Sequence, residues 1–204
     1  MKIVDFDFDP DLLRRFLEFP HLHYGSDPNW LLDPDEARLL APARSPSPTA
    51  RWRNFLAVGS DGEQIHGRLS AIATTHLLDE NGRPFGQIGF FECVDDQQTA
   101  GALVETALDW LRTNAPEVQT VLGPVNFDTW HAYRLRVSGF DQPTFAREPY
   151  NPPYYPALLE RLGFAPVAFY VTKTITEPAS LSAAWEQHHT QTVAQGFTFR
   201  PLNP

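Results

Sequence analysis

Cysteine, methionine and basic residues are scarce in this 204-residue chain. It has one cysteine, Cys93, and one methionine, and 25 aspartate and glutamate residues outnumber 16 lysine and arginine residues. A single cysteine excludes an internal disulfide bond and agrees with a reducing compartment. The net charge of -9 repels polyanions, so we expect no nucleic acid as a partner.

Long apolar runs and common catalytic motifs are also missing. No stretch approaches the ~20 apolar residues of a membrane span, and the opening Met1–Asp5 lacks the basic start and apolar run of a signal peptide. We find no Ser-centred elbow, Cys/His pair, Walker loop or dinucleotide fingerprint, and the histidines lack the grouping of metal ligands. We therefore expect a cytoplasmic protein with no membrane partner and no metal. With 42% hydrophobic residues, the chain has enough apolar mass for one core.

The order of apolar patterns predicts an α/β fold. A strand over 1–6 precedes a helix that Asp9 caps and Pro20 ends, and residues 41–49 are too rich in proline and serine to be regular. Strands over 54–58, 67–75 and 87–94 form an antiparallel meander, with turns at Ser60–Gly62 and Asn81–Gly82. A helix capped at Asp95 and Asp96 then leads to a buried strand over 119–122, which implies a right-handed crossover and parallel pairing.

The segment Tyr150–Phe164 couples an aromatic loop to a short helix. Pro152 and Pro153 fit a loop and the first turn of a helix, and Gly163 supplies the left-handed residue that ends the helix. The β-branched and aromatic run 167–172 after it is typical of a strand.

An asparagine-led helix that ends in Leu-Gly-Phe before a strand resembles the C-terminal motif of the GNAT superfamily of N-acetyltransferases. Further motifs extend the resemblance to a bacterial subgroup of GNAT-like proteins over roughly residues 50–175: Gly89–Glu92, Gly123–Phe127, Gly139–Asp141 with Pro143, and Tyr150–Phe164. The resemblance extends more weakly toward the N-terminus, at Pro20, Tyr24, Asp27, Pro28 and Trp30. The resemblance implies a mixed sheet, an antiparallel meander feeding a parallel pair, flanked by helices. Fold does not fix function, however.

The domain organisation follows from the same resemblance. We expect a GNAT-like domain over 1–178, followed by a helix and strand over 179–204. The hexapeptide 197–202 resembles the opening strand of another GNAT domain, as in the N-terminal domain of a longer protein, or it supplies the last strand of the present sheet. A second GNAT-like domain or a second copy of the chain is the corresponding partner.

Acetyl-CoA or another acyl-CoA is the cofactor that the resemblance implies. GNAT enzymes bind its pyrophosphate with backbone amides at the start of the long helix, where free donors and a partial positive charge favour anions. Here Asp95 and Asp96 stand in that loop, so the phosphate loop looks degenerate. Many GNAT enzymes also have a tyrosine acid four residues before the terminal Gly-Phe glycine, and that position is Leu159.

Five residues are candidates for the site. Glu92, among apolar neighbours on one strand face with Ile88 and Phe90, is the candidate base, because burial raises a carboxyl pKa toward neutrality. Its alternative is a structural glutamate in a hydrogen-bonded network. Tyr154 is a substitute acid that otherwise packs the loop. The expected substrate contacts are Asn126, Trp130 and Tyr155. Asn126 alternatively caps the following turn, Trp130 alternatively packs in the core or an interface, and Tyr155 alternatively packs the loop with its hydroxyl bonded locally.

Two functions follow as hypotheses. The first is an acyl-CoA-dependent N-acyltransferase acting on a small amine. The second is a non-catalytic GNAT-like binding or structural module of a two-domain protein, because departures at the phosphate loop and at Leu159 are what such a module would show.

Overall fold

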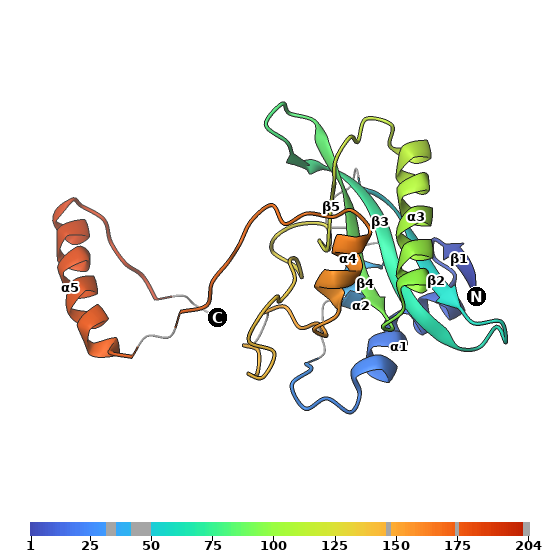
Figure 1. Cartoon of the computed structure of the whole chain (residues 1–204). Coiled ribbons are helices and arrows are strands. Elements are labelled where there is room, and N and C mark those ends of the chain that lie inside the picture. The colour runs from blue at the N-terminus through green and yellow to red at the C-terminus, as the bar shows by residue number, and fades with distance from the viewer. Residues whose placement is uncertain (32–35, 42–49, 146–147, 174–175, 202–204) are drawn as a thin grey trace. The chain divides into compact units, whose positions relative to one another are not determined.

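A computed structural model of the chain describes residues 1–31, 36–41, 50–145, 148–173 and 176–201 (Figure 1). The chain divides into two units, Met1–Ala165 and Pro166–Pro204. The first unit ends ahead of the expected domain boundary at residue 178.

The sheet of the first unit has five strands in the described residues, in the order β1-β2-β3-β4-β5. Their bounds are Lys2–Phe6 (β1), Arg51–Val58 (β2), Ile65–Leu78 (β3), Pro84–Cys93 (β4) and Val121–Leu122 (β5). β1 to β4 pair antiparallel, and the short β5 pairs parallel with β4. The prediction of an antiparallel meander that feeds a parallel pair is therefore confirmed.

The described residues of this unit form four helices: α1 (Pro10–Tyr24), α2 (Glu36–Leu39), α3 (Gln97–Asn114) and α4 (Tyr155–Arg161). On one face of the sheet, α3 and α4 bury a core with β2, β3 and β4 that includes Leu69, Ile88 and Leu103. On the other face, residues of α1 and α2 pack against the sheet in a second core that includes Phe16 and Phe90. The sheet is thus a central layer with an apolar core on each side.

The helix α1 begins as expected but does not end where expected. Asp9 accepts hydrogen bonds from the amides of Asp11 and Leu12, which confirms the cap. The helix continues through Pro20 to Tyr24, so the expected end at Pro20 is wrong. Proline has no amide hydrogen to donate to the carbonyl four residues earlier, which is that of Phe16. The Arg68 guanidinium donates to this carbonyl instead, at 2.9 Å, and replaces the missing helical bond.

The segment around α4 forms largely as predicted. Gly163 adopts φ 88 just after α4, and its amide donates to the Glu160 carbonyl. The helix itself starts at Tyr155, with Pro156 in its first turn.

The second unit contains the expected C-terminal helix, α5 (Pro178–Ala194). The strands expected at 167–172 and 197–202 are wrong within the described residues, where neither stretch is a strand. A strand needs a partner strand to satisfy its backbone, and the described part of this unit holds none. The predicted irregular stretch 41–49 lies almost wholly outside the described residues. No helix in the described ranges has the length and apolar character needed to cross a bilayer.

Candidate functional site

A bulge in β4 places the candidate base. Ser70 pairs with Gly89 and Arg68 pairs with Glu92, so two steps along β3 face three along β4. The extra residue lies at Phe90, which has φ 52. Ile88 packs on the α3 side of the sheet, whereas Phe90 packs on the α1 side. The expectation that Ile88, Phe90 and Glu92 share one face is therefore wrong, because a bulge interrupts the alternation.

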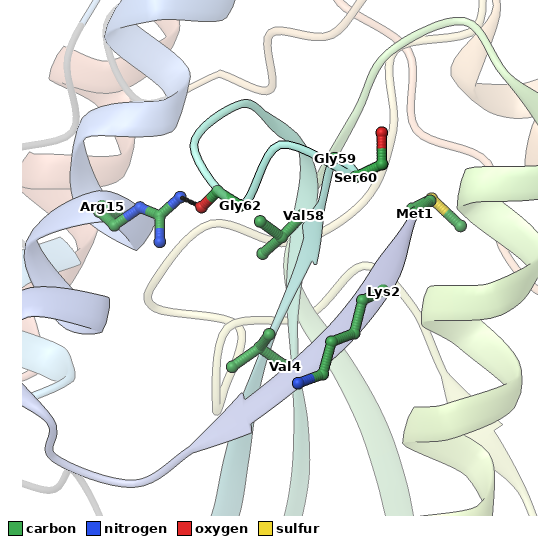
Figure 2. A pocket seen from close by; sticks show the side chains of 8 residues that line it. All are labelled: Met1, Lys2, Val4, Arg15, Val58, Gly59, Ser60 and Gly62. Atoms are coloured by element: carbon green, nitrogen blue, oxygen red, sulfur yellow. Dashed lines mark hydrogen bonds between the residues drawn. The ribbon is translucent and has the colours of Figure 1, made fainter.

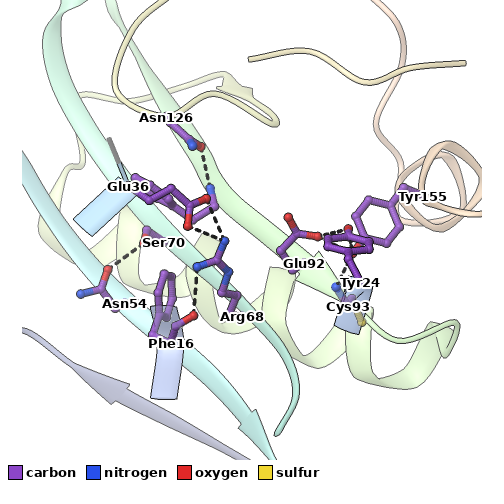
Figure 3. Close-up of polar contacts among 11 residues, drawn as sticks. Phe16, Tyr24, Glu36, Asn54, Arg68, Ser70, Glu92, Cys93, Asn126 and Tyr155 are labelled. Atoms are coloured by element: carbon purple, nitrogen blue, oxygen red, sulfur yellow. Dashed lines mark hydrogen bonds and ion pairs between the residues drawn. The ribbon is translucent and has the colours of Figure 1, made fainter. Parts of the chain in front are cut away.

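Glu92 sits in a cluster of hydroxyl groups at the edge of the sheet (Figure 3). Tyr24, the last residue of α1, donates to Glu92 Oε2, and Tyr155 of α4 donates to the same oxygen at 2.7 Å. The two tyrosine oxygens are 3.0 Å apart. The Tyr155 oxygen also accepts from the Cys93 amide at 2.8 Å. Three segments far apart in the sequence, α1, β4 and α4, therefore meet at one carboxylate.

The environment of Glu92 shifts its pKa toward neutrality. Glu92 keeps part of its surface accessible, yet protein surrounds it densely, and the loss of water raises its pKa from 4.5 to about 7. The Arg68 cation and the hydroxyls of Tyr24 and Tyr155 oppose this rise in the pKa. Burial and the neighbouring carboxylate raise the pKa of both tyrosines, so their hydroxyls remain protonated donors.

Arg68 links the Glu92 cluster to the rest of the first unit. It lies opposite Glu92 in the β3–β4 register and is fully buried. Its guanidinium contacts both carboxylate oxygens of Glu36 at 2.9 Å, as well as the Phe16 carbonyl (Figure 3). Arg68 is not among the residues expected at the site, although a charged residue at an inward position of a central strand is a usable signal.

Tyr154, the candidate acid, lies beside the Glu92 cluster. Its hydroxyl donates to the Cys93 carbonyl at 2.8 Å and lies 3.1 Å from His23 Nε2. Burial raises the pKa of Tyr154 and lowers that of His23. Burial and nearby carboxylates raise the pKa of the Cys93 thiol to about 12, so this cysteine is not a thiolate nucleophile at neutral pH.

Aromatic rings and a second carboxylate adjoin Tyr24. Its ring centroid lies 5.7 Å from that of Trp30 and 5.3 Å from that of Tyr150. The Tyr150 hydroxyl donates to Asp27, and this bond, with one from the Asn29 backbone, lowers the pKa of Asp27. Aromatic faces and carboxylates are the groups that attract ammonium ions. The N-terminal part of the sequence resemblance is therefore brought together in space, at Tyr24, Asp27 and Trp30.

The remaining predicted contacts lie apart from the Glu92 cluster. Asn126 is buried, and its Oδ1 accepts the Phe90 amide at 2.7 Å, a bond to β4 and not to the turn that follows Asn126. Trp130 is 86% exposed, and its backbone amide donates to Asp128. Both stay predictions as substrate contacts. Of the predicted site residues, Glu92 and Tyr155 are in direct contact. Tyr154 contacts Cys93, the residue next to Glu92.

The start of α3 does not fit the pyrophosphate of an acyl-CoA. The Asp96 carboxylate accepts the amide of Thr99 at 2.9 Å and its hydroxyl at 2.5 Å. These hydrogen bonds lower the pKa of Asp96 and keep it negative. Asp95 beside it is exposed. An anion site needs uncommitted donors, and here the Asp96 carboxylate takes the Thr99 amide and adds a negative charge that repels phosphate.

A surface cavity of about 430 Å³ lies elsewhere, between β1, α1 and the β2–β3 turn (Figure 2). Lys2, Arg15 and Gly62 are among its lining residues, and Arg15 donates to the Gly62 carbonyl at 2.9 Å. Neither Glu92 nor Trp130 lines it. Among the described residues, no three histidine, cysteine or acidic side chains converge as metal ligands.

Comparison with known protein sequences finds one partial match. No family model matches the chain. Protein YghO of Escherichia coli (strain K12) is 29% identical over 154 residues, which are 74% of this chain and 38% of that protein. The chain therefore spans well under half the length of this relative.

Comparison with solved structures finds acetyltransferases. A putative acetyl transferase from Pyrococcus furiosus is 16% identical, with a TM-score of 0.48 over 85% of this chain and 100% of that chain. A predicted acetyltransferase from Clostridium acetobutylicum, solved with acetyl-CoA, is 14% identical, with a TM-score of 0.45 over 86% and 97%. An aminoglycoside acetyltransferase from an uncultured soil sample, solved with sisomicin, is 14% identical, with a TM-score of 0.44 over 85% and 93%. At these TM-scores the likeness supports no statement about the chemistry of this chain.

Proposed function

We propose that the Glu92 cluster binds a small amine and takes a proton from it, which is the acceptor half of the N-acyl transfer that the sequence resemblance implies. The observation that carries the proposal is a partly accessible carboxylate whose pKa is about 7 and whose Oε2 is held by Tyr24 and Tyr155. A general base works best when its pKa lies near the working pH. Near neutral pH Glu92 therefore exchanges between its ionised and protonated forms, and the ionised form can accept a proton.

The proton transfer runs from the ammonium group of the ligand to the Glu92 carboxylate. Alkylamines have pKa values near 10 and arrive as ammonium ions, which the carboxylates of Glu92 and Asp27 attract. One N–H bond breaks, its proton goes to Glu92, and the electron pair stays on the amine nitrogen as the nucleophile's lone pair. The rings of Trp30 and Tyr150 beside Tyr24 favour a cationic ligand at this end of the sheet.

A second function, the non-catalytic module, is favoured by the hydrogen bonds that the Thr99 amide and hydroxyl donate to Asp96 at the start of α3. Under this hypothesis the cluster binds an amine without transferring anything to it. An acyl-CoA donor has no fitting phosphate site at this helix, so we assign it no binding residues.

Calorimetry and a product assay separate the two functions. The chain is titrated with acetyl-CoA and with a panel of primary alkylamines, amino acids and amino sugars, and N-acetylated products are sought by mass spectrometry. The proposal expects an amine whose binding weakens at least tenfold in Glu92→Gln and is unchanged in Glu160→Gln, an exposed control on α4. A product that is lost in Glu92→Gln identifies acyl transfer, and amine binding without product identifies the module. If no amine in the panel binds, the proposed function is contradicted.

A further inference from the structure

The bulge in β4 is a strained feature that its surroundings must hold in place. Phe90 adopts φ 52, and Phe127, whose ring centroid lies 6.0 Å from that of Phe90, adopts φ 69. Bulky side chains seldom take these left-handed conformations. Such residues persist where the surrounding structure fixes them, and they cluster at functional sites.

Residues 125–127 fix the bulge from the open edge of β4. The Val125 amide donates to the Ile88 carbonyl at 2.9 Å, and Gln87 Nε2 donates to the Phe127 carbonyl at 2.9 Å. Between these two contacts, Asn126 Oδ1 accepts the Phe90 amide at 2.7 Å. The bulge removes this amide from the β3–β4 ladder, and a buried amide without a partner would be costly.

Gly89 permits this close approach. A Cβ atom at position 89 would lie 2.7 Å from the Val125 carbonyl oxygen and 3.2 Å from Asn126 Oδ1. Only glycine at position 89 leaves room for residues 125–127 to reach the Phe90 amide. The bulge therefore depends on residues 89, 90 and 126 together.

We propose that Asn126 is a positioning residue: by accepting the Phe90 amide it holds the β4 bulge that turns Glu92 toward Tyr24 and Arg68. Without the extra residue, regular alternation would place Glu92 on the face of Ile88, which packs toward α3. The inference rests on the role proposed for Glu92 and names what keeps its carboxylate in place.

A wild-type measurement tests the contact without any substitution. The Phe90 amide should exchange its hydrogen slowly, and its backbone chemical shifts should report a left-handed residue. Fast exchange of this amide, or extended-strand shifts at Phe90, would overturn the proposal. This result is independent of any amine, so it separates the failure of the positioning role from the failure of the proposed function.

Variants test the consequence for Glu92, whose carboxyl is titrated by carbon-13 NMR. Asn126→Leu removes the acceptor, and we expect the Glu92 midpoint to fall by one pH unit or more as the carboxylate loses its packed surroundings. Asn126→Asp keeps an acceptor oxygen and adds negative charge, so the left-handed Phe90 should persist and the midpoint should stay or rise. The ionisable groups that interact with Glu92 are unchanged in all variants: Tyr24, Glu36, Arg68, Cys93, Tyr150, Tyr154 and Tyr155.

Asn54→Leu is the matched control, because Asn54 is an equally buried asparagine on β2 that bonds Ser70 and the Asp7 carbonyl. In this control the titration midpoint of Glu92 should stay within about 0.3 pH units of the wild-type midpoint. If Asn126→Leu and Asn54→Leu move the midpoint equally, Asn126 is merely structural and the proposal fails. If Asn126→Leu does not fold, loss of the left-handed Phe90 in Asn126→Asp overturns the proposal, and its retention supports it.

Discussion

Replacing Glu92 with glutamine is predicted to change how the stability of the protein depends on pH. The pKa of Glu92 is about 7 in the folded chain, against an ordinary value of 4.5. Because the folded state holds the proton more tightly than the unfolded state, protonation of this group stabilises the fold. This stabilisation is complete below pH 4.5 and is lost as the pH rises through 7.

The magnitude follows from the two pKa values. A tenfold change in proton affinity corresponds to about 1.4 kcal/mol, so a rise from 4.5 to about 7 corresponds to a loss of about 3 kcal/mol. Glutamine cannot ionise, so the variant should lack this loss. It still offers an oxygen acceptor to Tyr24 and Tyr155.

Urea unfolding, followed by tryptophan fluorescence from pH 4.5 to 8.5, measures the effect. The difference between the free energies of unfolding of wild type and Glu92→Gln should change by about 3 kcal/mol across this range, to the disadvantage of the wild type at high pH. Groups that titrate identically in both proteins, such as His23, cancel in the difference. A difference that stays constant with pH would refute the reasoning, and Glu160→Gln should follow the wild type throughout.

Three further substitutions test the framework around the site by the free energy of unfolding. Arg68→Met leaves the Glu36 carboxylate unpaired and should cost about 3–5 kcal/mol; a cost below 1 kcal/mol would contradict the role of this buried pair. Asp96→Ala removes the cap of α3 and should lower the free energy of unfolding by about 1 kcal/mol. An unchanged free energy of unfolding would show that the cap does not stabilise the helix. Gly89→Ala should cost about 1–3 kcal/mol because its Cβ meets backbone, whereas Gly101→Ala inside α3 meets only a side-chain carbon at 3.6 Å and should add about 0.5–1 kcal/mol. Equal effects of the two alanines would refute the close approach at position 89.

Much of the fold could be read from local signals. The caps at Asp9 and Asp96, the turn glycines at 62 and 82, and the left-handed Gly163 each act over a few residues, and each is found where expected. Signals that depend on distant partners failed. Pro20 does not end α1, because Arg68, 48 positions along the chain, takes the carbonyl that Pro20 leaves free.

The site could be predicted only in part, because it too depends on contacts between residues that are far apart in the sequence. Residue type and strand position singled out Glu92, but the bulge that orients it depends on the Asn126 side chain, 36 residues from Phe90. Its partners Tyr24 and Tyr155 lie 68 and 63 residues away in the sequence. The run 167–172 has strand propensity but no strand partner in the described residues, so propensity alone misled.

The direct titration of the Glu92 carboxyl by carbon-13 NMR tests the central claim, that this carboxylate is set to accept a proton near neutral pH. We predict a midpoint near 7 that falls when an amine ligand binds, because an ammonium ion favours the charged carboxylate. A midpoint near 4.5 in the free protein would contradict this claim, because Glu92 would then have the pKa of an ordinary carboxyl group.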